Sequence, residues 1–332
     1  MKYLFTEEKV KDFYIYKNQE IFVFDDKLQI GNQVLDSIPK YSYFVQNDNL
    51  ERVFFTEDHR EEYFLYQDGQ FVAQDCRYGD NFTFLSSTQK LSSKFDDGKI
   101  NVSLIDGTQE VLFDINAESD LGISKIINKH SIMIFPMNDK KSLLFYTKTG
   151  QRLWEYKEED ENLKINGRCI PVVDDVVAVI SLYGARPKKI QGFNIRTGER
   201  LWINQSEAKY EPDTFHIGAD KMLYGCRGYV VSPGIGITKL NPLTGELEVS
   251  LINKDEEFDF MPWNVTMHGR QLYYTDNRRG NEIGVIDVDK RELIERVPLN
   301  IKKKVTIGAP VVTDDKVYVF IQDLQELRVF EK

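Results

Sequence analysis

The residue types that most often perform catalysis or bind metal ions are few and scattered in this chain of 332 residues. The histidines form no HExxH or HxH pair and the cysteines form no CxxC pair, so the sequence contains no local metal-binding motif. Three isolated cysteines indicate reduced thiols rather than a disulfide framework. We therefore expect neither a metal nor a cofactor. The residues concerned are His59, His130, His216 and His268, and Cys76, Cys169 and Cys226.

Motifs for nucleophilic or phosphate chemistry are also missing. No GxSxG turn, Walker loop or dinucleotide fingerprint occurs, and the Gly-Ile-Gly at 234–236 precedes no helical pattern. The paired carboxylates Asp174-Asp175 and Asp314-Asp315 occupy equivalent places in two similar segments. This recurrence indicates turn residues rather than a general acid and base. Local motifs therefore assign no catalytic residue.

Recurring segments of about 16 residues show which elements must position these side chains. Each segment is an alternating strand, a tight polar turn and a second strand, which predicts a β-hairpin. The clearest are LLFYTKTGQRLWEY (143–156), KIQGFNIRTGERLWIN (189–204), GITKLNPLTGELEVSL (236–251) and EIGVIDVDKRELIERV (282–297). Successive turns, at Thr149-Gly150, Thr197-Gly198, Thr244-Gly245 and Asp289-Lys290, lie 48, 47 and 45 residues apart. A turn glycine supplies the positive φ that such a hairpin requires.

Weaker hairpins complete the pattern. Copies occur at 20–35, 62–75 and 99–114, and a first half occurs at 326–332. A second hairpin type, with an Asp-Asp turn between apolar strands, precedes two of the copies at 169–181 and 309–321. The unit is therefore four short antiparallel strands, here called A, B, C and D in chain order. Units of this kind repeated around an axis are the blades of a β-propeller.

We therefore predict an all-β fold, a β-propeller forming a single domain over 1–332, with eight blades of four strands. The expected blades are 2–37, 41–75, 82–114, 122–156, 169–204, 213–250, 261–297 and 308–331. The last blade lacks a D strand, for which Lys2–Phe5 is the candidate. If 1–37 and 308–331 form one blade instead, the number of blades is seven.

Composition agrees with this fold and argues against nucleic-acid and membrane partners. The 21 Phe and 17 Tyr favour pleated, half-buried surfaces. The net charge of −10 argues against nucleic-acid binding, which depends on Lys and Arg neutralising phosphates. No 18-residue apolar window and no signal-peptide pattern occurs, so we expect a cytoplasmic protein with no membrane partner.

The (D/N)xxTGxxxW pattern resembles the PQQ-like, or quinoprotein-type, β-propeller repeat family. The pattern is clear over 120–332, at Thr149-Gly150 with Trp154, at Asn194 with Thr197-Gly198 and Trp202, and at Asn241 with Thr244-Gly245. The resemblance implies that the Thr-Gly pair makes the C–D turn and that Trp154 and Trp202 pack between blades. Enzymes of the family hold pyrroloquinoline quinone beside an adjacent cysteine pair, which this chain lacks. Its non-enzymatic members act as assembly scaffolds.

Antiparallel strands place the A–B and C–D turns at one end of each unit, here called the short-turn face. The B–C and D–A connections lie at the other end, the long-loop face, where binding residues usually gather. Basic and aromatic side chains in three B–C connections are candidates for binding a partner, and an acidic protein segment or a small anionic ligand would suit them. The alternative is a solvated rim of mixed charge. The candidates are Arg186, Lys188, Arg227, Tyr229, Arg278 and Arg279, with Arg60 and Tyr78 in earlier loops.

Two further residues have alternative interpretations. Trp263 lies in the most apolar long loop, at 258–264, where it either plugs the channel or packs between blades, or else forms an aromatic anchor for a partner. His216 lies in an expected A strand, where it is either a satisfied core histidine or, with Asp213, part of a site at the axial mouth.

Two functions follow from these features. The first is a non-enzymatic propeller that binds a protein partner through the long-loop face, as a scaffold, an inhibitor or an immunity-type protein. The second is an enzyme, a hydrolase or lyase, whose axial site draws on several blades, including His216, Asp213, Arg186 and Arg278.

Overall fold

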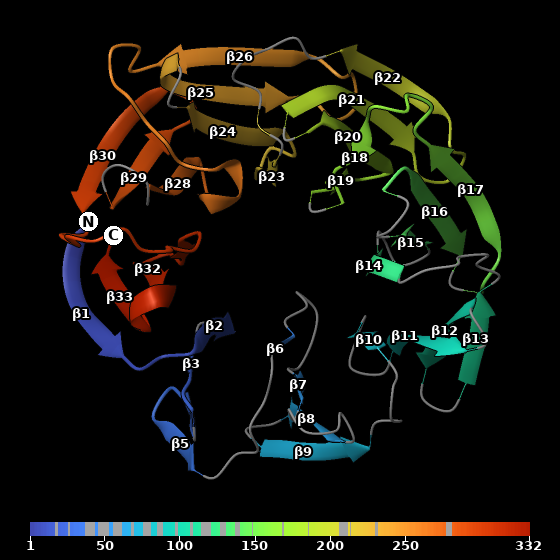
Figure 1. Ribbon diagram of the computed structural model, residues 1–332, viewed down its shortest axis with the longest axis horizontal. Helices are drawn as coiled ribbons and strands as arrows, with labels where there is room; N and C mark the ends of the chain where they lie inside the picture. Colours follow the sequence, from blue (N-terminus) through green and yellow to red (C-terminus); the bar gives the residue numbers. More distant parts are fainter. Residues whose placement is uncertain are drawn as a thin grey trace. The chain divides into compact units, whose positions relative to one another are not determined.

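The computed structural model describes most of the chain as short antiparallel strands (Figure 1). It leaves out residues 17–18, 26, 37–43, 46–52, 56–61, 68–69, 76–80, 85–88, 97–98, 107–108, 114–120, 127–130, 137–139, 148, 168, 185, 206–211, 213, 230–231 and 277–280. Almost all side chains from 35 to 139 also lie outside the description. No described helix is long and apolar enough to cross a membrane.

The described strands form antiparallel sheets within two compact units. Unit 1 comprises Met1–Ile38, Arg168–Phe193 and Arg200–Lys332. One sheet is formed by β2 (Asp12–Tyr16), β3 (Gln19–Val23), β4 (Lys27–Ile30) and β5 (Gln33–Asp36), and a second contains β19 (Val172–Val173), β20 (Val176–Tyr183), β21 (Arg186–Asn194) and β22 (Arg200–Gln205). A third is formed by β23 (His216–Ile217), β24 (Leu223–Tyr229), β25 (Ser232–Leu240) and β26 (Leu247–Ile252), and a fourth by β27 (Val265–His268), β28 (Gln271–Asp276), β29 (Glu282–Asp287) and β30 (Glu292–Pro298). In the last sheet, β31 (Val311–Val312), β32 (Lys316–Ile321) and β33 (Glu326–Glu331) are joined by β1 (Lys2–Glu8). Two short 3₁₀ helices are η1 (Pro262–Asn264) and η2 (Gln322–Leu324).

Unit 2 comprises Pro39–Gly167 and Asn194–Glu199. Its sheets are β6 (Phe44–Val45), β7 (Val53–Phe55), β8 (Glu62–Gln67) and β9 (Gln70–Asp75); β10 (Asn81–Phe84), β11 (Gln89–Asp96), β12 (Lys99–Asp106) and β13 (Gln109–Phe113); and β14 (Leu121–Ile126), β15 (Ser131–Pro136), β16 (Ser142–Thr147) and β17 (Arg152–Lys157), followed by β18 (Lys164–Ile165). The sheets of both units follow the predicted A–B–C–D order closely and confirm the all-β architecture. The number of blades and the single domain stay predictions.

The first strand of the chain belongs to the last sheet. β1 pairs antiparallel with β33, with Lys2 opposite Glu331 and Glu8 opposite Glu326 (Figure 1). This confirms the expectation that Lys2–Phe5 supplies the missing D strand. The pairing exists because the last repeat ends after its C strand, which would otherwise leave a row of unpaired backbone donors and acceptors.

The C–D turns show why the Asn-x-x-Thr-Gly spacing recurs. The Asn194 side-chain oxygen accepts hydrogen bonds from the backbone N–H groups of Arg196 and Thr197, at 2.9 and 3.1 Å. Asp287 does the same for Asp289 and Lys290 in the β29–β30 turn, at 3.0 and 2.9 Å. An Asx side chain that binds the backbone two and three residues ahead starts a turn, and the turn is then closed by a residue with positive φ. Gly150, Gly198 and Gly245 take that place, with φ of 85°, 72° and 76°.

Each of two tryptophans packs against the turn of the following repeat. The Trp202 indole N–H donates to the Pro242 carbonyl at 2.7 Å, and a Cβ on Gly245 would lie 2.6 Å from the Trp202 ring. Within unit 2, Trp154 donates to the Ile195 carbonyl at 2.6 Å and covers Gly198 in the same way. The implied packing role of both tryptophans therefore holds at the C–D turns.

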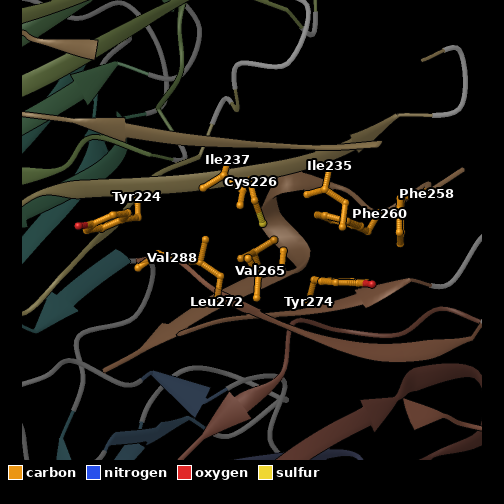
Figure 2. Close-up of a cluster of buried hydrophobic side chains, with 11 residues drawn as sticks. Tyr224, Cys226, Ile235, Ile237, Phe258, Phe260, Val265, Leu272, Tyr274 and Val288 are labelled. Carbon is orange, nitrogen blue, oxygen red and sulfur yellow. The ribbon is translucent and has the colours of Figure 1, made fainter. Parts of the chain in front are cut away.

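The apolar core lies between neighbouring sheets of unit 1. Figure 2 shows one such cluster, in which β24 and β25 face β28 and β29. Phe258 and Phe260 of the connecting loop complete it, and both are fully buried. Tyr224 and Tyr274 are also fully buried there. These contacts account for part of the Phe and Tyr excess, because each large ring fills space between two pleated surfaces.

We expect Gly245→Ala to destabilise the protein more than Gly269→Ala. Both glycines have positive φ, but a Cβ at Gly269 meets no atom within 4 Å. Gly269→Ala should therefore cost only the left-handed penalty of about 1–2 kcal/mol. Gly245→Ala should cost about 1–3 kcal/mol more, because the new methyl group displaces the Trp202 ring. Urea unfolding measures both, and equal losses would contradict the packing role of Trp202.

Candidate functional site

On the short-turn face of unit 1, charged side chains of neighbouring A–B turns bind one another. Lys221 Nζ lies 2.7 Å from an Asp174 carboxylate oxygen, and Arg270 Nη1 lies 2.7 Å from Asp220 Oδ2. Between the sheets that contain β27 and β31, His268 Nε2 lies 3.2 Å from Asp314 Oδ1. The paired aspartates are therefore turn residues, as predicted, and Asp174 and Asp314 also link adjacent sheets.

Arg270 is the most highly connected of these side chains. Its Nε donates to Asp289 Oδ2 at 2.8 Å while Nη2 binds the other oxygen of the same carboxylate. The hydrogen bonds from Arg270 lower the pKa of Asp289. Burial raises the pKa of Asp220, but hydrogen bonds from Tyr224 and Arg270 outweigh it and leave that pKa below its ordinary value. Burial, and then the bond to Asp220, raise the pKa of Tyr224 to about 12.

A polar cavity of about 440 Å³ also opens on this side, between β3 and β32. Its wall contains Glu20, whose Oε1 accepts hydrogen bonds from Lys316 Nζ at 2.8 Å and from the Tyr318 hydroxyl at 2.6 Å. The Glu20 carboxylate is therefore occupied in joining two sheets. The paired charges described above thus stabilise contacts within the fold.

The long-loop face has a different construction, seen first in the connection between β26 and β27. Phe260 stacks on Tyr274 with ring centroids 4.2 Å apart, and Phe258 meets the same ring edge-on at 6.4 Å (Figure 2). A Cβ on Gly228 would lie 2.6 Å from Phe258, so only glycine allows this approach. The loop is therefore fixed at its centre by buried aromatic packing.

An arginine holds the same loop from outside. Arg296 Nη1 binds Glu256 at 2.7 Å, and Nη2 binds the largely buried Glu282 at 3.0 Å. The guanidinium also lies 5.3 Å from the centre of the Phe258 ring. Glu256 belongs to an acidic stretch of the sequence at 255–259, and the structure shows that its charge is already paired. In a second acidic stretch, at 158–161, Glu158 is buried and accepts a hydrogen bond from the Tyr156 hydroxyl at 2.8 Å.

Trp263 stands at the end of this fixed loop. Its neighbours Pro262 and Asn264 are buried, whereas the Trp263 side chain is 45 % exposed. The Asn264 side-chain amide donates to the Ile307 carbonyl at 3.3 Å and thereby joins the loop to the next D–A connection. A large aromatic side chain is thus presented to solvent on a short helix that is held from both sides.

The next D–A connection carries three exposed lysines, Lys302, Lys303 and Lys304, which sequence reasoning did not single out. None of the three forms an ion pair with a residue that the structure describes. Asn281 holds their backbone by donating to the Ile301 and Lys303 carbonyls at 2.9 and 3.1 Å. The lysine run at a D–A position was visible in the sequence, although a run of like charges has no periodicity that indicates structure.

Three predicted basic residues, Arg186, Lys188 and Arg227, lie in strands rather than in a long loop. β20 runs to Tyr183 and β21 begins at Arg186, so strand structure replaces most of the loop expected in this B–C connection. Lys188 is exposed in β21, and Arg227 is half-buried in β24. Strand alternation puts Lys188 on the face of Ile190 and Arg227 on the face of Leu223. Because Ile190 and Leu223 share one core cluster, the two basic residues lie on facing sheets at the same end.

The remaining predicted residues are only partly described. Arg186 and Tyr229 lie in β21 and β24, but their side chains are outside the described part of the chain. His216 lies in β23 as expected; its Nε2 is buried with no hydrogen-bond partner among the described residues, and burial lowers its pKa. Residues entirely outside the description are Arg60, Tyr78, Asp213, Arg278, Arg279, His59, His130 and Cys76.

Metal and thiol chemistry receive no support from the described residues. Among them, no group of three or more His, Cys, Asp or Glu side chains is arranged to hold a metal ion. Cys169 and Cys226 are buried thiols, and burial raises the pKa of Cys226 far above its ordinary value. A thiol kept protonated in this way is a poor nucleophile.

Comparison with known proteins identifies the fold. No protein-family model and no curated protein matches the chain. Among solved structures, the chain is similar to BamB from Moraxella catarrhalis, with 12 % identity, a TM-score of 0.59 and 99 % of each chain covered. It is also similar to Sqt1 from Saccharomyces cerevisiae, with 12 % identity, a TM-score of 0.60 and 100 % of this chain and 99 % of that chain covered. The fold is a β-propeller.

An enzyme shares the same architecture. A catalytically inactive variant of virginiamycin B lyase from Staphylococcus aureus, with quinupristin, is 12 % identical over 96 % of this chain and 97 % of that chain, with a TM-score of 0.52. Likeness at this identity is a likeness of fold. The predicted propeller is therefore confirmed, and function must be argued from the side chains of this chain.

The pH dependence of stability should reveal the Arg270 cluster. Asp220 and Asp289 have pKa values lowered in the folded state, so they contribute stability above the ordinary aspartate pKa of about 3.9 and lose it as pH falls through the folded values. Arg270→Gln should therefore lower the urea midpoint at pH 7, and its difference from wild type should shrink at acidic pH. Arg291→Gln is the control, because Arg291 is paired with one carboxylate, that of Glu248, and both side chains are exposed. A difference for Arg270→Gln that stays constant from pH 7 to pH 3 would refute the assignment.

Proposed function

We propose that this propeller binds a protein partner through the long-loop face, with Trp263 as the anchor. The observation that carries the proposal is the combination of exposure and support at this residue: Trp263 is 45 % exposed, while residues on both sides of it are buried. Tryptophan is among the residues that contribute most to protein interfaces, because its large rigid ring loses little conformational entropy on binding.

The fixed loop strengthens this proposal. Phe258 and Phe260 pack against Tyr274, and Asn264 binds the neighbouring connection, so the backbone on either side of Trp263 has its own interactions. Binding then requires little ordering of the loop, which leaves more of the contact free energy for affinity. A tryptophan that served only the core would not need to be displayed in this way.

Charge indicates the kind of partner. Asn264 binds the Ile307 carbonyl, and Ile307 is three residues from Lys304, a separation of at most about 10 Å along the chain. The exposed lysines at 302–304 therefore belong to the same surface as Trp263, on a chain whose net charge is −10. Complementary charge steers association and selects partners. A partner that offers an acidic segment beside an apolar one fits this surface.

An enzyme with an axial site is the alternative. The likeness to a virginiamycin B lyase variant leaves this possibility open at the level of fold. The observation in its favour is His216, whose buried Nε2 has no described hydrogen-bond partner and whose pKa is lowered by burial. No second titratable group in the described part of the chain is hydrogen-bonded to that nitrogen, so partner binding is the better supported function.

Trp263→Ala should abolish capture of the partner without unfolding the protein. Tagged wild-type and variant chains are used to capture proteins from an extract of the source cells, and captured proteins are quantified by mass spectrometry. Loss of a central aromatic anchor should weaken binding about thirtyfold, or about 2 kcal/mol. Leu243→Ala is the matched control, because Leu243 is 56 % exposed in a short C–D turn. A set of captured proteins that responds equally to both variants would refute the role of Trp263.

The lysines should act through charge. Replacing Lys302, Lys303 and Lys304 together by Gln should weaken capture of the same partner, and replacement by Glu should weaken it further. The order follows from first removing and then reversing the attraction to an acidic segment. Added salt should reduce the difference between wild type and the Glu variant. Capture that is unchanged in the Glu variant would exclude an acidic partner segment at this loop.

A further inference from the structure

The outermost strand β1 leaves one edge without a partner. In its sheet the order is β1–β33–β32–β31, so β1 is bonded on one side to β33 and ends the sheet on the other. An open edge of this kind presents backbone N–H and C=O groups that can pair with another strand. Most proteins protect such an edge with charged residues, proline or a short strand.

β1 lacks that protection at its centre. Tyr3, Leu4 and Phe5 are 53 %, 39 % and 37 % exposed. On the outer strand β30, by contrast, exposed Ile294 is followed by Glu295 and Arg296, and residue by residue the strand alternates between exposed and partly buried positions. Three exposed large apolar residues in succession on an open strand edge favour association.

The charges at the two ends of β1 identify the occupant. The strand reads Lys2-Tyr-Leu-Phe-Thr-Glu7-Glu8, with a positive end and a negative end. An antiparallel copy centred on Phe5 would place Lys2 of each strand opposite Glu8 of the other. The bulge between Tyr3 and Phe5 shifts this register by one residue at most, which places Lys2 opposite Glu7 instead. Neither glutamate, nor Lys2, forms an ion pair with a described residue of its own chain.

We propose that β1 pairs antiparallel with β1 of a second copy of this chain, forming a two-fold symmetric dimer with a sheet continuous across both copies. A two-fold axis requires a self-complementary surface, and this strand meets the requirement in both apolar content and charge. A seven-residue strand pair buries less than a standard interface, so the dimer is weak and depends on concentration. The proposal concerns a surface separate from Trp263 and does not depend on partner binding.

Sedimentation velocity from micromolar to millimolar concentration tests the dimer on chains that span residues 1–332 and carry no N-terminal tag. The free amino group of Met1 is needed because it pairs with Glu295. Lys2→Glu alone and Glu7→Lys/Glu8→Lys alone should each raise the dissociation constant about tenfold or more, because both end pairs become repulsive. Glu292→Lys on β30 is the control for charge reversal on another outer strand and should change nothing.

Mixing the two variants gives the decisive result. In a mixed dimer, the glutamate introduced at position 2 of one chain would face a lysine introduced at position 7 or 8 of the other, and both end pairs would be attractive again. An equimolar mixture should therefore dimerise although each variant alone does not, which a merely structural role of β1 would not produce. A wild-type chain that stays monomeric throughout, or a dimer that neither variant weakens, would overturn the proposal.

Discussion

The contact between an indole ring and the turn of the next repeat is the interaction on which the architecture of this propeller depends. Trp202 donates to the Pro242 carbonyl and covers Gly245, so one side chain both satisfies a turn carbonyl and seals the space beneath it. The turn is shaped beforehand by Asn241, whose side-chain oxygen binds the Leu243 N–H at 2.9 Å. The turns that Trp154 and Trp202 cover are therefore shaped by side chains of their own repeats.

The part of the fold set by local interactions was predictable from the sequence. Turn chemistry and strand alternation occupy windows of about 16 residues, so the hairpins, their order and the strand missing from the last repeat could be read directly. The basic run at 186–189 was misplaced for the opposite reason. Arg186-Pro-Lys-Lys189 has the composition of a loop, but the hydrogen bonds of the neighbouring strands draw it into β21. Pairing with another strand outweighs the weak preference of a polar segment.

The candidate site was predictable only in outline. The position of Trp263 in a long apolar loop was visible, but its exposure depends on Phe258 and Phe260 filling the space beside Gly228 and Tyr274, far away in sequence. The acidic loop residues show the same limit. Glu256 looks free in the sequence, yet Arg296, 40 residues later, binds it. The lysines at 302–304 were overlooked because a charge run without periodicity indicates only solvent exposure.

The connections at the two ends of the sheets in unit 1 are held in different ways, and connection length is the physical reason. Short turns on adjacent sheets come within ion-pair distance, as Asp174 and Lys221 do, so their charges are used within the fold. A long connection has enough residues to fix itself by burying two or three of them and still present others. In the 253–264 loop, Phe258 and Phe260 serve the core and Trp263 faces solvent. Side chains of one loop thus differ in their surroundings: two are buried in the apolar core, and a third is 45 % exposed.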